Sequence, residues 1–559
     1  MQKKNLVLLS AASALLLTSC SKLGPLTADN FTVVPNPMES HAGQVPVTIN
    51  GAFPEKYMKK KAVVTVTPEL RYGNGQVARG TSATFQGEKV EGNDQTISYQ
   101  VGGNYTMKSN FKYAPEMQKS ELYLTFDARI GKKQKEVPAV KVANGIIATS
   151  ELAGRTVKSA QACIAPDSFR RVTEARQVAN VKFLIQQANL RKSELKNNSV
   201  TEFVELLKKI NADKEGLNLS NVEISAYASP DGGVELNDKL ASKRQQNTEK
   251  YVNEQLKATN NQDANVDAKY TAQDWEGFQE LVQASNIQDK DVILRVLSMY
   301  KDPEEREQQI KNMSAGFREL ADGILPQLRR ARMTINYEVI GRDDEQIMAQ
   351  YQADPKQLSV EELLYAATLQ DGADAQEQIY KTTAEVYPND CRAFNNVAAI
   401  EYAKGNYAEA QNWLKKALAI DPACSEANAN LGLLALQAGD TQTAETHIAK
   451  ASSANGLAEV VGNLHLAQGN YAQAEQDFAK VNSNSAALAQ ILNKNYSAAT
   501  NTLANIKNGD AMTDYLRAIL LARQGNNAEA ATALRSAVAK DVSLAQYAAN
   551  DLELANVSK

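Results

Sequence analysis

Residues 391–424 read CRAFNNVAAIEYAKGNYAEAQNWLKKALAIDPAC and contain two helical patterns separated by a glycine. Gly405 and Gly439 lie 34 residues apart, and the residues around them recur at the same period. A period of this length indicates stacked helical hairpins. Small residues at fixed positions let paired helices approach closely, and large residues fill the gaps between repeats. The stretch therefore predicts an α-solenoid over residues 358–545, with a capping helix over 546–559.

These positions resemble the tetratricopeptide repeat. The matching residues in the quoted stretch are Phe394, Val397, Ala398, Tyr402, Gly405, Tyr407, Ala410, Leu414, Ala417 and Pro422. Similar sets follow around Gly432, Gly462 and Gly525. A shortened unit near Tyr496 and a degenerate one over 358–388 bring the expected number to five or six. The resemblance implies that the solenoid binds protein partners.

The inner surface of such a solenoid is made by the first helix of each pair. The residues expected on that surface are Asn395, Tyr402, Glu426, Leu433, Leu436, Asn463, Tyr515 and Arg523. Their mixture of polar and apolar side chains suits a peptide or helix of a partner protein. The surface lacks the cluster of lysine and arginine that would bind a C-terminal carboxylate.

Residues 176–341 mix strand and helix patterns, which predicts an α/β domain. Alternation over 181–185 and 222–226 predicts two strands, each followed by a helical pattern. Alternation over 331–339 predicts a last strand. Residues 260–320 are expected to form a helical insertion before it.

Residues 222–252, VEISAYASPDGGVELNDKLASKRQQNTEKYV, resemble the core motif of the OmpA-like C-terminal domain, whose register Asn237, Leu240 and Arg244 keep. Leu328-Arg329-Arg330-Ala331 resembles a second motif of that family. Family members bind the diaminopimelate carboxylates of peptidoglycan without hydrolysing it. An arginine suits this task because its rigid fork donates two parallel hydrogen bonds to a carboxylate.

The loop before this helix departs from the family pattern. Ser229 stands where the family has an aspartate, and Asp231 follows two residues later. Pro230 and Gly232 allow a different turn, so that Asp231 can supply the missing charge. The resemblance thus implies a peptidoglycan-binding site of Ser229, Asp231, Asn237 and Arg244. The alternative is a domain retained as a structural or protein-docking module.

Residues 31–150 alternate polar and apolar side chains over short stretches broken by Gly, Pro and Asn. Clear cases are 45–49, 62–67 and 121–126. This pattern is typical of an antiparallel β-sandwich. Residues 151–175 and 342–357 then read as linkers on either side of the α/β domain.

The N-terminus begins with Lys3 and Lys4, followed by an apolar run over 6–17 that is too short to span a membrane. The ending Leu17-Thr18-Ser19-Cys20 resembles the lipobox of bacterial lipoproteins, which implies a signal peptide over 1–19 and acylation of Cys20. Residues 20–30 would be a tether. Ser21, with no acidic residue before Asp29, resembles the sorting pattern for a periplasm-facing outer-membrane lipoprotein. The alternative is a plain cleaved signal with an incidental cysteine.

Cys163, Cys391 and Cys424 are the remaining cysteines. Equivalent points on neighbouring helix pairs are about 10 Å apart, one helix-packing distance. Cys391 and Cys424 flank one repeat, so this spacing would place them beyond disulfide reach. All three are expected to act as small buried apolar residues.

The composition argues against nucleic-acid binding and against catalysis. The 559 residues carry 61 basic and 65 acidic side chains, which gives no electrostatic footprint for nucleic acid. His41, His447 and His465 are scattered, and no nucleophile elbow or zinc-protease helix motif occurs. We expect no catalytic site, no metal site and no cofactor.

The combined expectation is a non-enzymatic scaffold. A lipid at Cys20 would hold it to the outer membrane, the α/β domain would bind peptidoglycan, and the solenoid would bind protein. Two attachments on one molecule raise the effective concentration of the second, so each can be weak. The alternative is an accessory subunit for outer-membrane protein, secretion or surface-appendage assembly, in which the OmpA-like domain no longer binds the wall.

Overall fold

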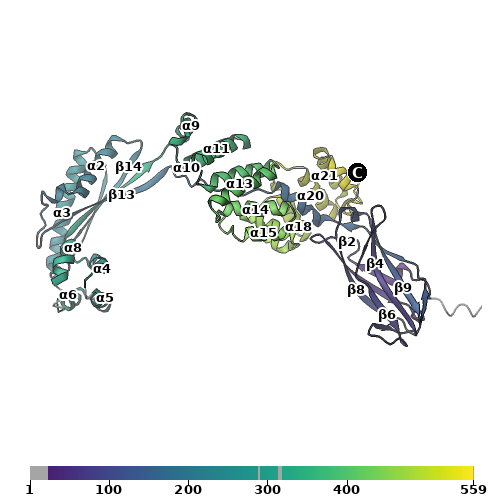
Figure 1. The fold of residues 1–559 in the computed structure, drawn as a ribbon. Helices are drawn as coiled ribbons and strands as arrows, with labels where there is room; N and C mark the ends of the chain where they lie inside the picture. The colour runs from purple at the N-terminus through teal and green to yellow at the C-terminus, as the bar shows by residue number, and fades with distance from the viewer. Residues whose placement is uncertain (1–22, 288–289, 313–317, 558–559) are drawn as a thin grey trace, which may run out of the picture. The chain divides into compact units, whose positions relative to one another are not determined.

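The computed structural model describes residues 23–287, 290–312 and 318–557. The chain divides into two compact units: residues 1–167 with 363–559, and residues 168–362 (Figure 1). The first unit is therefore discontinuous in sequence, and the second is inserted into it. The expected signal peptide and Cys20 lie outside the described residues.

The N-terminal part of the first unit is rich in strands. A three-stranded antiparallel sheet has the order β1-β3-β8, and a larger sheet has the order β10-β9-β4-β6-β7 with β5 and β11 at its sides. The strands are β1 (Phe31–Val34), β3 (Gln44–Phe53), β4 (Ala62–Tyr72), β5 (Gln76–Arg79), β6 (Ala83–Gly87), β7 (Gln95–Ile97), β8 (Gly103–Lys112), β9 (Ser120–Ile130), β10 (Lys133–Lys135) and β11 (Val140–Asn144). Buried residues of both sheets form one apolar core. The expected alternation is clearest in β3 and β4.

Helix pairs follow in the C-terminal part of the same unit. They are α12 (Cys391–Ala403) with α13 (Tyr407–Ile420), α14 (Ser425–Gln437) with α15 (Thr441–Ile448), α16 (Leu457–Ala467) with α17 (Tyr471–Asp477), α18 (Asn484–Leu492) with α19 (Tyr496–Asn505), and α20 (Ala511–Arg523) with α21 (Asn527–Lys540). The degenerate repeat is α10 (Val360–Thr368) with α11 (Ala373–Val386). Gly405, Gly439, Gly469 and Gly525 follow first helices with φ between 80° and 83°, a conformation that glycine adopts without strain.

The second unit contains a four-stranded sheet of order β13-β16-β14-β15, in which β14 and β15 are parallel and the other pairs antiparallel. Its elements are β13 (Val172–Lys182), α2 (Asn198–Ala212), β14 (Leu217–Tyr227), α3 (Val234–Ala258), β15 (Asn265–Thr271), α4 (Trp275–Ala284), α5 (Lys290–Met299), α6 (Pro303–Asn312), α8 (Leu325–Leu328) and β16 (Arg330–Ile340). Helices α2 and α3 pack on the sheet. The later helices surround a separate small core.

Several segments differ from the expectations. Residues 265–271 form a strand that adds to the edge of the sheet, so the inserted helices begin only at Trp275. The expected linker 342–357 contains the helix α9 (Asp344–Ala353), and β13 already begins at Val172. The expected capping helix is α22 (Ser543–Ala548) followed by a 3-10 turn over Leu552–Leu554.

In the parts of the chain that the structure describes, no helix is both long and apolar enough to cross a bilayer.

Candidate functional site

The loop between β14 and α3 is held by Asn237, which lies in the first turn of α3. Its side-chain amide donates to the carbonyl oxygens of Ser229 (2.9 Å) and Gly232 (2.7 Å). The hydroxyl of Ser229 in turn donates to the Asp231 carboxylate. Three of the four residues expected in the peptidoglycan site therefore lie together, and Asn237 serves to shape the loop.

Arg244, the fourth residue, is only 1% exposed. Its guanidinium donates to the backbone carbonyl oxygens of Tyr227 (2.8 Å), Gln187 (3.0 Å) and Leu184 (3.3 Å). Burial, with a contribution from the charge of Arg329, lowers the pKa of Arg244 to about 10. A guanidinium carries five N–H groups, and these contacts use three of them.

Arg329 completes this cleft, although it was not among the expected site residues. Its guanidinium pairs with Asp231 at 2.8 Å and donates to the Ser229 hydroxyl at 3.2 Å. Arg329, Arg244 and Asp231 line a cavity of about 50 Å³. The motif at 328–331 placed Arg329 just before the last strand. Its contact with Ser229, which lies 100 residues earlier in the chain, depends on the tertiary fold.

The inner surface of the solenoid is occupied by the chain itself. Residues 153–167, which we call the strap, follow the strand-rich part and bind the first helices of successive repeats. Asn396 donates to the carbonyl oxygen of Ala165 (3.0 Å) and accepts from its N–H (2.8 Å). Asn430 makes the same two bonds with Cys163, at 2.8 and 2.7 Å. The predicted linker 151–175 is thus largely a bound segment.

The two asparagines occupy equivalent repeat positions. Each lies nine residues before the residue of positive φ that follows its helix: 396 before Gly405, and 430 before Gly439. In the shortened repeat the same position, before Lys494, is Ser485, whose hydroxyl donates to that of Thr156 at 3.0 Å. The strap therefore runs antiparallel to the order of the repeats, because later repeats bind earlier strap residues. The two asparagines contact only backbone atoms of the strap.

Several residues expected to contact a partner in the groove are at most 5% exposed: Asn395, Tyr402, Leu433, Leu436 and Tyr515. Asn395 donates to the carbonyl oxygen of Cys163 (3.0 Å) and Tyr402 to that of Val157 (2.5 Å). Leu433 and Leu436 belong to the core that includes strap residues. Tyr515 donates to Asp551 at 2.7 Å, within the C-terminal cap. These side chains bind the chain's own segments.

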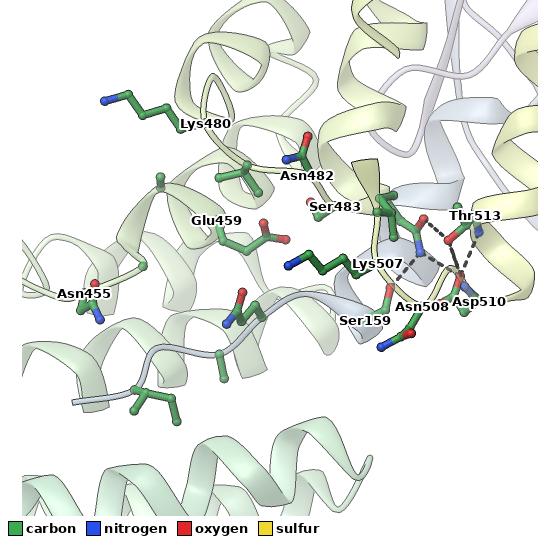
Figure 2. A pocket seen from close by; sticks show the side chains of 18 residues that line it. Ser159, Asn455, Glu459, Lys480, Asn482, Ser483, Lys507, Asn508, Asp510 and Thr513 are labelled. Atoms are coloured by element: carbon green, nitrogen blue, oxygen red, sulfur yellow. Dashed lines mark hydrogen bonds between the residues drawn. The ribbon is translucent and has the colours of Figure 1, made fainter. Parts of the chain in front are cut away.

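An open cavity of about 530 Å³ lies beside the strap (Figure 2). Strap residues 159–164 form one wall, and the N-terminal ends of α16, α18 and α20 form the others. The polar and charged residues that line it are Ser159, Gln161, Asn455, Glu459, Lys480, Asn482, Ser483, Asn484, Lys507, Asn508, Asp510 and Thr513. The cavity therefore offers hydroxyl, amide and carboxylate groups together with the ammonium group of Lys507 (Figure 2).

Two carboxylates line this cavity, Glu459 on α16 and Asp510 at the N-cap of α20. Glu459 is 4% exposed and points into the cavity, while Lys480 points away (Figure 2). The carboxylate of Glu459 accepts hydrogen bonds from the Asn463 amide (3.3 Å) and the Ser483 hydroxyl. Burial raises the pKa of Glu459 to about 7. Asp510 accepts hydrogen bonds from Asn484 (2.9 Å) and Thr513. Among the described residues, neither carboxylate has a lysine or arginine within ion-pair distance.

No group of three or more His, Cys, Asp and Glu side chains is arranged to hold a metal ion within residues 23–287, 290–312 and 318–557.

Residues 401–464 and 511–536 match family models of the tetratricopeptide repeat. The solenoid is built from tetratricopeptide repeats. Together the matches span less than a fifth of the chain, and both lie within the solenoid. A search of curated proteins found no match.

Solved structures of other repeat proteins are similar to this chain. A tetratricopeptide repeat protein from Parabacteroides merdae is 16% identical, with a TM-score of 0.27 over 42% of this chain and 94% of that one. Yeast Tom70 is 12% identical, with a TM-score of 0.24 over 64% and 82%. YrrB, described as having an unusual peptide-binding site, is 16% identical, with a TM-score of 0.21 over 37% and 99%.

Proposed function

We propose that this protein is a non-enzymatic scaffold anchored by a lipid at Cys20 to the periplasmic face of the outer membrane. Its repeats bind protein partners, as tetratricopeptide repeats do in general, and its second unit binds peptidoglycan.

The anchor predicts that Cys20→Ser moves the protein from the membrane fraction to the soluble fraction. A wild-type chain that is already soluble would contradict the anchor.

The cleft of the second unit supports the peptidoglycan proposal by its charges. Arg244 and Arg329 line the same cavity as Asp231. An amino acid of the peptidoglycan stem peptide carries a carboxylate and an amine. Its carboxylate can bind the guanidinium groups, and its amine can bind Asp231. The pairing of Arg329 with Asp231 keeps both charges in place before a ligand binds.

Sedimentation of the purified full-length protein with isolated peptidoglycan tests this site. We expect the wild type to sediment and Arg329→Gln to stay in solution. The matched control is Arg295→Gln, which removes an exposed guanidinium from α5 and should sediment like the wild type. Binding that survives both Asp231→Ala and Arg329→Gln would refute the assignment.

A second candidate function is the accessory subunit without wall binding. The small cavity and the Asp231–Arg329 pair favour it, because a ligand must compete with contacts that the cleft already makes. In that case the wild-type protein itself would not sediment with peptidoglycan, while the solenoid would still capture protein.

The cavity beside the strap is the open part of the inner surface, and we propose that partners bind there with a lysine or arginine side chain. Among the described residues, buried Glu459 has no cation within ion-pair distance, and opposite charges attract more strongly in a low-dielectric surrounding. Asp510 is exposed and caps α20, and it adds a second negative charge to the cavity wall. A photo-crosslinking residue in place of Asn482 should trap a partner in intact cells. The same residue in place of the exposed Asn412, on α13, is the control.

Glu459→Lys should abolish the crosslinked product at position 482. Crosslinking that is equal at 482 and 412, or unaffected by Glu459→Lys, would contradict this docking site.

A further inference from the structure

Cys391 and Cys424 do not lie a helix-packing distance apart, as the repeat spacing suggested. Their sulfur atoms are 2.7 Å apart. The two cysteines are separated by 33 residues, one fewer than the 34-residue period. Cys424 is thus the N-cap of α14, the position that Asp390 holds before α12, whereas Cys391 is the first residue of α12. This offset places both side chains in the gap between the two helices.

A second contact shows that the two helices are held together at this point. The amide of Asn430 on α14 donates to the side-chain oxygen of Asn395 on α12, at 2.9 Å. Asn395 lies about one turn beyond Cys391. The closeness of the sulfurs therefore follows from the packing of neighbouring first helices.

The chemistry of the pair favours thiolate formation at one sulfur. The hydrogen bond from Cys391 lowers the pKa of Cys424, with further help from the backbone N–H of Ala427. Both sulfurs lie at helix N-termini, where the helix dipole stabilises a thiolate. Cys163 in the strap differs, because burial raises the pKa of its thiol to about 12.

We propose that Cys391 and Cys424 form a disulfide by exchange with a small disulfide compound such as oxidised glutathione. One thiolate attacks the external disulfide and releases one thiol, which leaves a mixed disulfide. The second cysteine, having lost its proton, attacks the protein sulfur of that mixed disulfide and releases the second thiol. The protein loses two protons and two electrons, and the external disulfide gains them as it becomes two thiols.

The crosslink fastens the two helices that bind the strap. Asn396 on α12 and Asn430 on α14 hold strap residues two positions apart, Ala165 and Cys163. A covalent bond between the first turns of these helices fixes the separation of the two asparagines. The oxidised solenoid should therefore hold the strap more firmly than the reduced one.

The test uses the full chain with Cys20→Ser, treated with oxidised glutathione under native conditions, then denatured and alkylated. We expect three alkylatable thiols before oxidation and one afterwards, with peptide mapping that joins Cys391 to Cys424. Cys391→Ser should form no internal crosslink, and Cys424 should keep glutathione as a mixed disulfide that no second cysteine resolves. Cys163→Ser should form the crosslink as the parent does.

In the chain that carries both Cys391 and Cys424, three alkylatable thiols after oxidation, a crosslink that includes Cys163, or a stable glutathione adduct would overturn the proposal. Equal crosslinking rates in the native and urea-denatured chain would also overturn it, because the fold would then contribute nothing. Hydrogen exchange of the Cys163 and Ala165 amides should be slower in the oxidised chain. Equal exchange rates would overturn the effect on the strap.

Discussion

At the scale of single residues, Glu459 is the clearest departure from what a stable fold prefers. A buried carboxylate without a cation costs free energy in its charged form, and its pKa rises as a result. The hydrogen bonds from Asn463 and Ser483 offset only part of that cost. The charged form of such a group lowers the stability of the fold, which fits a binding role better than a structural one.

Replacing Glu459 with glutamine should change how stability depends on pH. Burial raises the pKa of Glu459 from 4.5 to about 7, so the folded chain holds this proton more tightly than the unfolded chain. Stability is therefore lost as pH rises from about 4.5 to 7, by roughly 3 kcal/mol in all. Glu459→Gln does not lose this stability. The difference in unfolding free energy between the variant and the wild type should therefore grow from pH 5 to pH 8.

Urea unfolding at pH 5 and pH 8 measures this difference in unfolding free energy, and hydrogen exchange in α16 checks it locally. Glu529→Gln removes an exposed carboxylate from α21 and is the control. The same pH dependence in Glu459→Gln and in the wild type would contradict the interpretation.

Sequence reasoning reached some of these residues and missed others for physical reasons. Asn237, Ser229 and Asp231 lie in one loop and the turn after it, so a local motif could place them together. Arg329 and Glu459 depend on contacts between distant segments. The offset that brings Cys391 to Cys424 is a single residue in a 34-residue repeat.

At the scale of elements, the strap shows how repeats can bind an extended segment independently of its sequence. Helical periodicity predicted the solenoid well because each hairpin is a local structure. The strap has no such periodicity, and its bonds run to helices more than 200 residues away. Residues 153–159 form short helical turns with local backbone bonds, whereas residues 160–167 have no regular structure and are held by the groove.

Asn396→Ala should release the strap locally. The change leaves the buried N–H and carbonyl of Ala165 without partners, at a cost of about 2 kcal/mol or more. Hydrogen exchange of the Ala165 amide should accelerate accordingly. Asn412→Ala removes an exposed asparagine that bonds to Glu409 and should leave the strap unchanged. Undiminished protection in Asn396→Ala would show that other contacts alone hold the strap.

At the scale of the whole molecule, the second unit is an insertion within the first. The strap leads into it, and the helices that bind the strap come after it. The solenoid also contacts the strand-rich part, through the rings of His41 and Tyr471 (4.9 Å between centroids) and a 2.7 Å bond from Thr149 to Glu553. The first unit thus holds together by contacts on both sides of the insertion.

A single cut between Lys356 and Gln357, both exposed, should not separate the two fragments. The N-terminal fragment carries the strap, and the C-terminal fragment carries its binding helices. Gel filtration after cleavage at an engineered site should therefore give one complex. With Asn396→Ala and Asn430→Ala together, the dissociation constant should rise at least tenfold, which is about 1.4 kcal/mol. Separate elution of the unmutated fragments would contradict this prediction.

The chain order has a consequence for biosynthesis. Cys163 is made 232 residues before Asn395 and 267 before Asn430, which at 5 to 20 residues per second is an interval of roughly tens of seconds. Throughout that interval the segment and its thiol are open to proteases and to stray oxidation. A chain that ends before Cys391 lacks every repeat helix that bonds Cys163 and Ala165, so in such a truncated chain this segment stays uncovered.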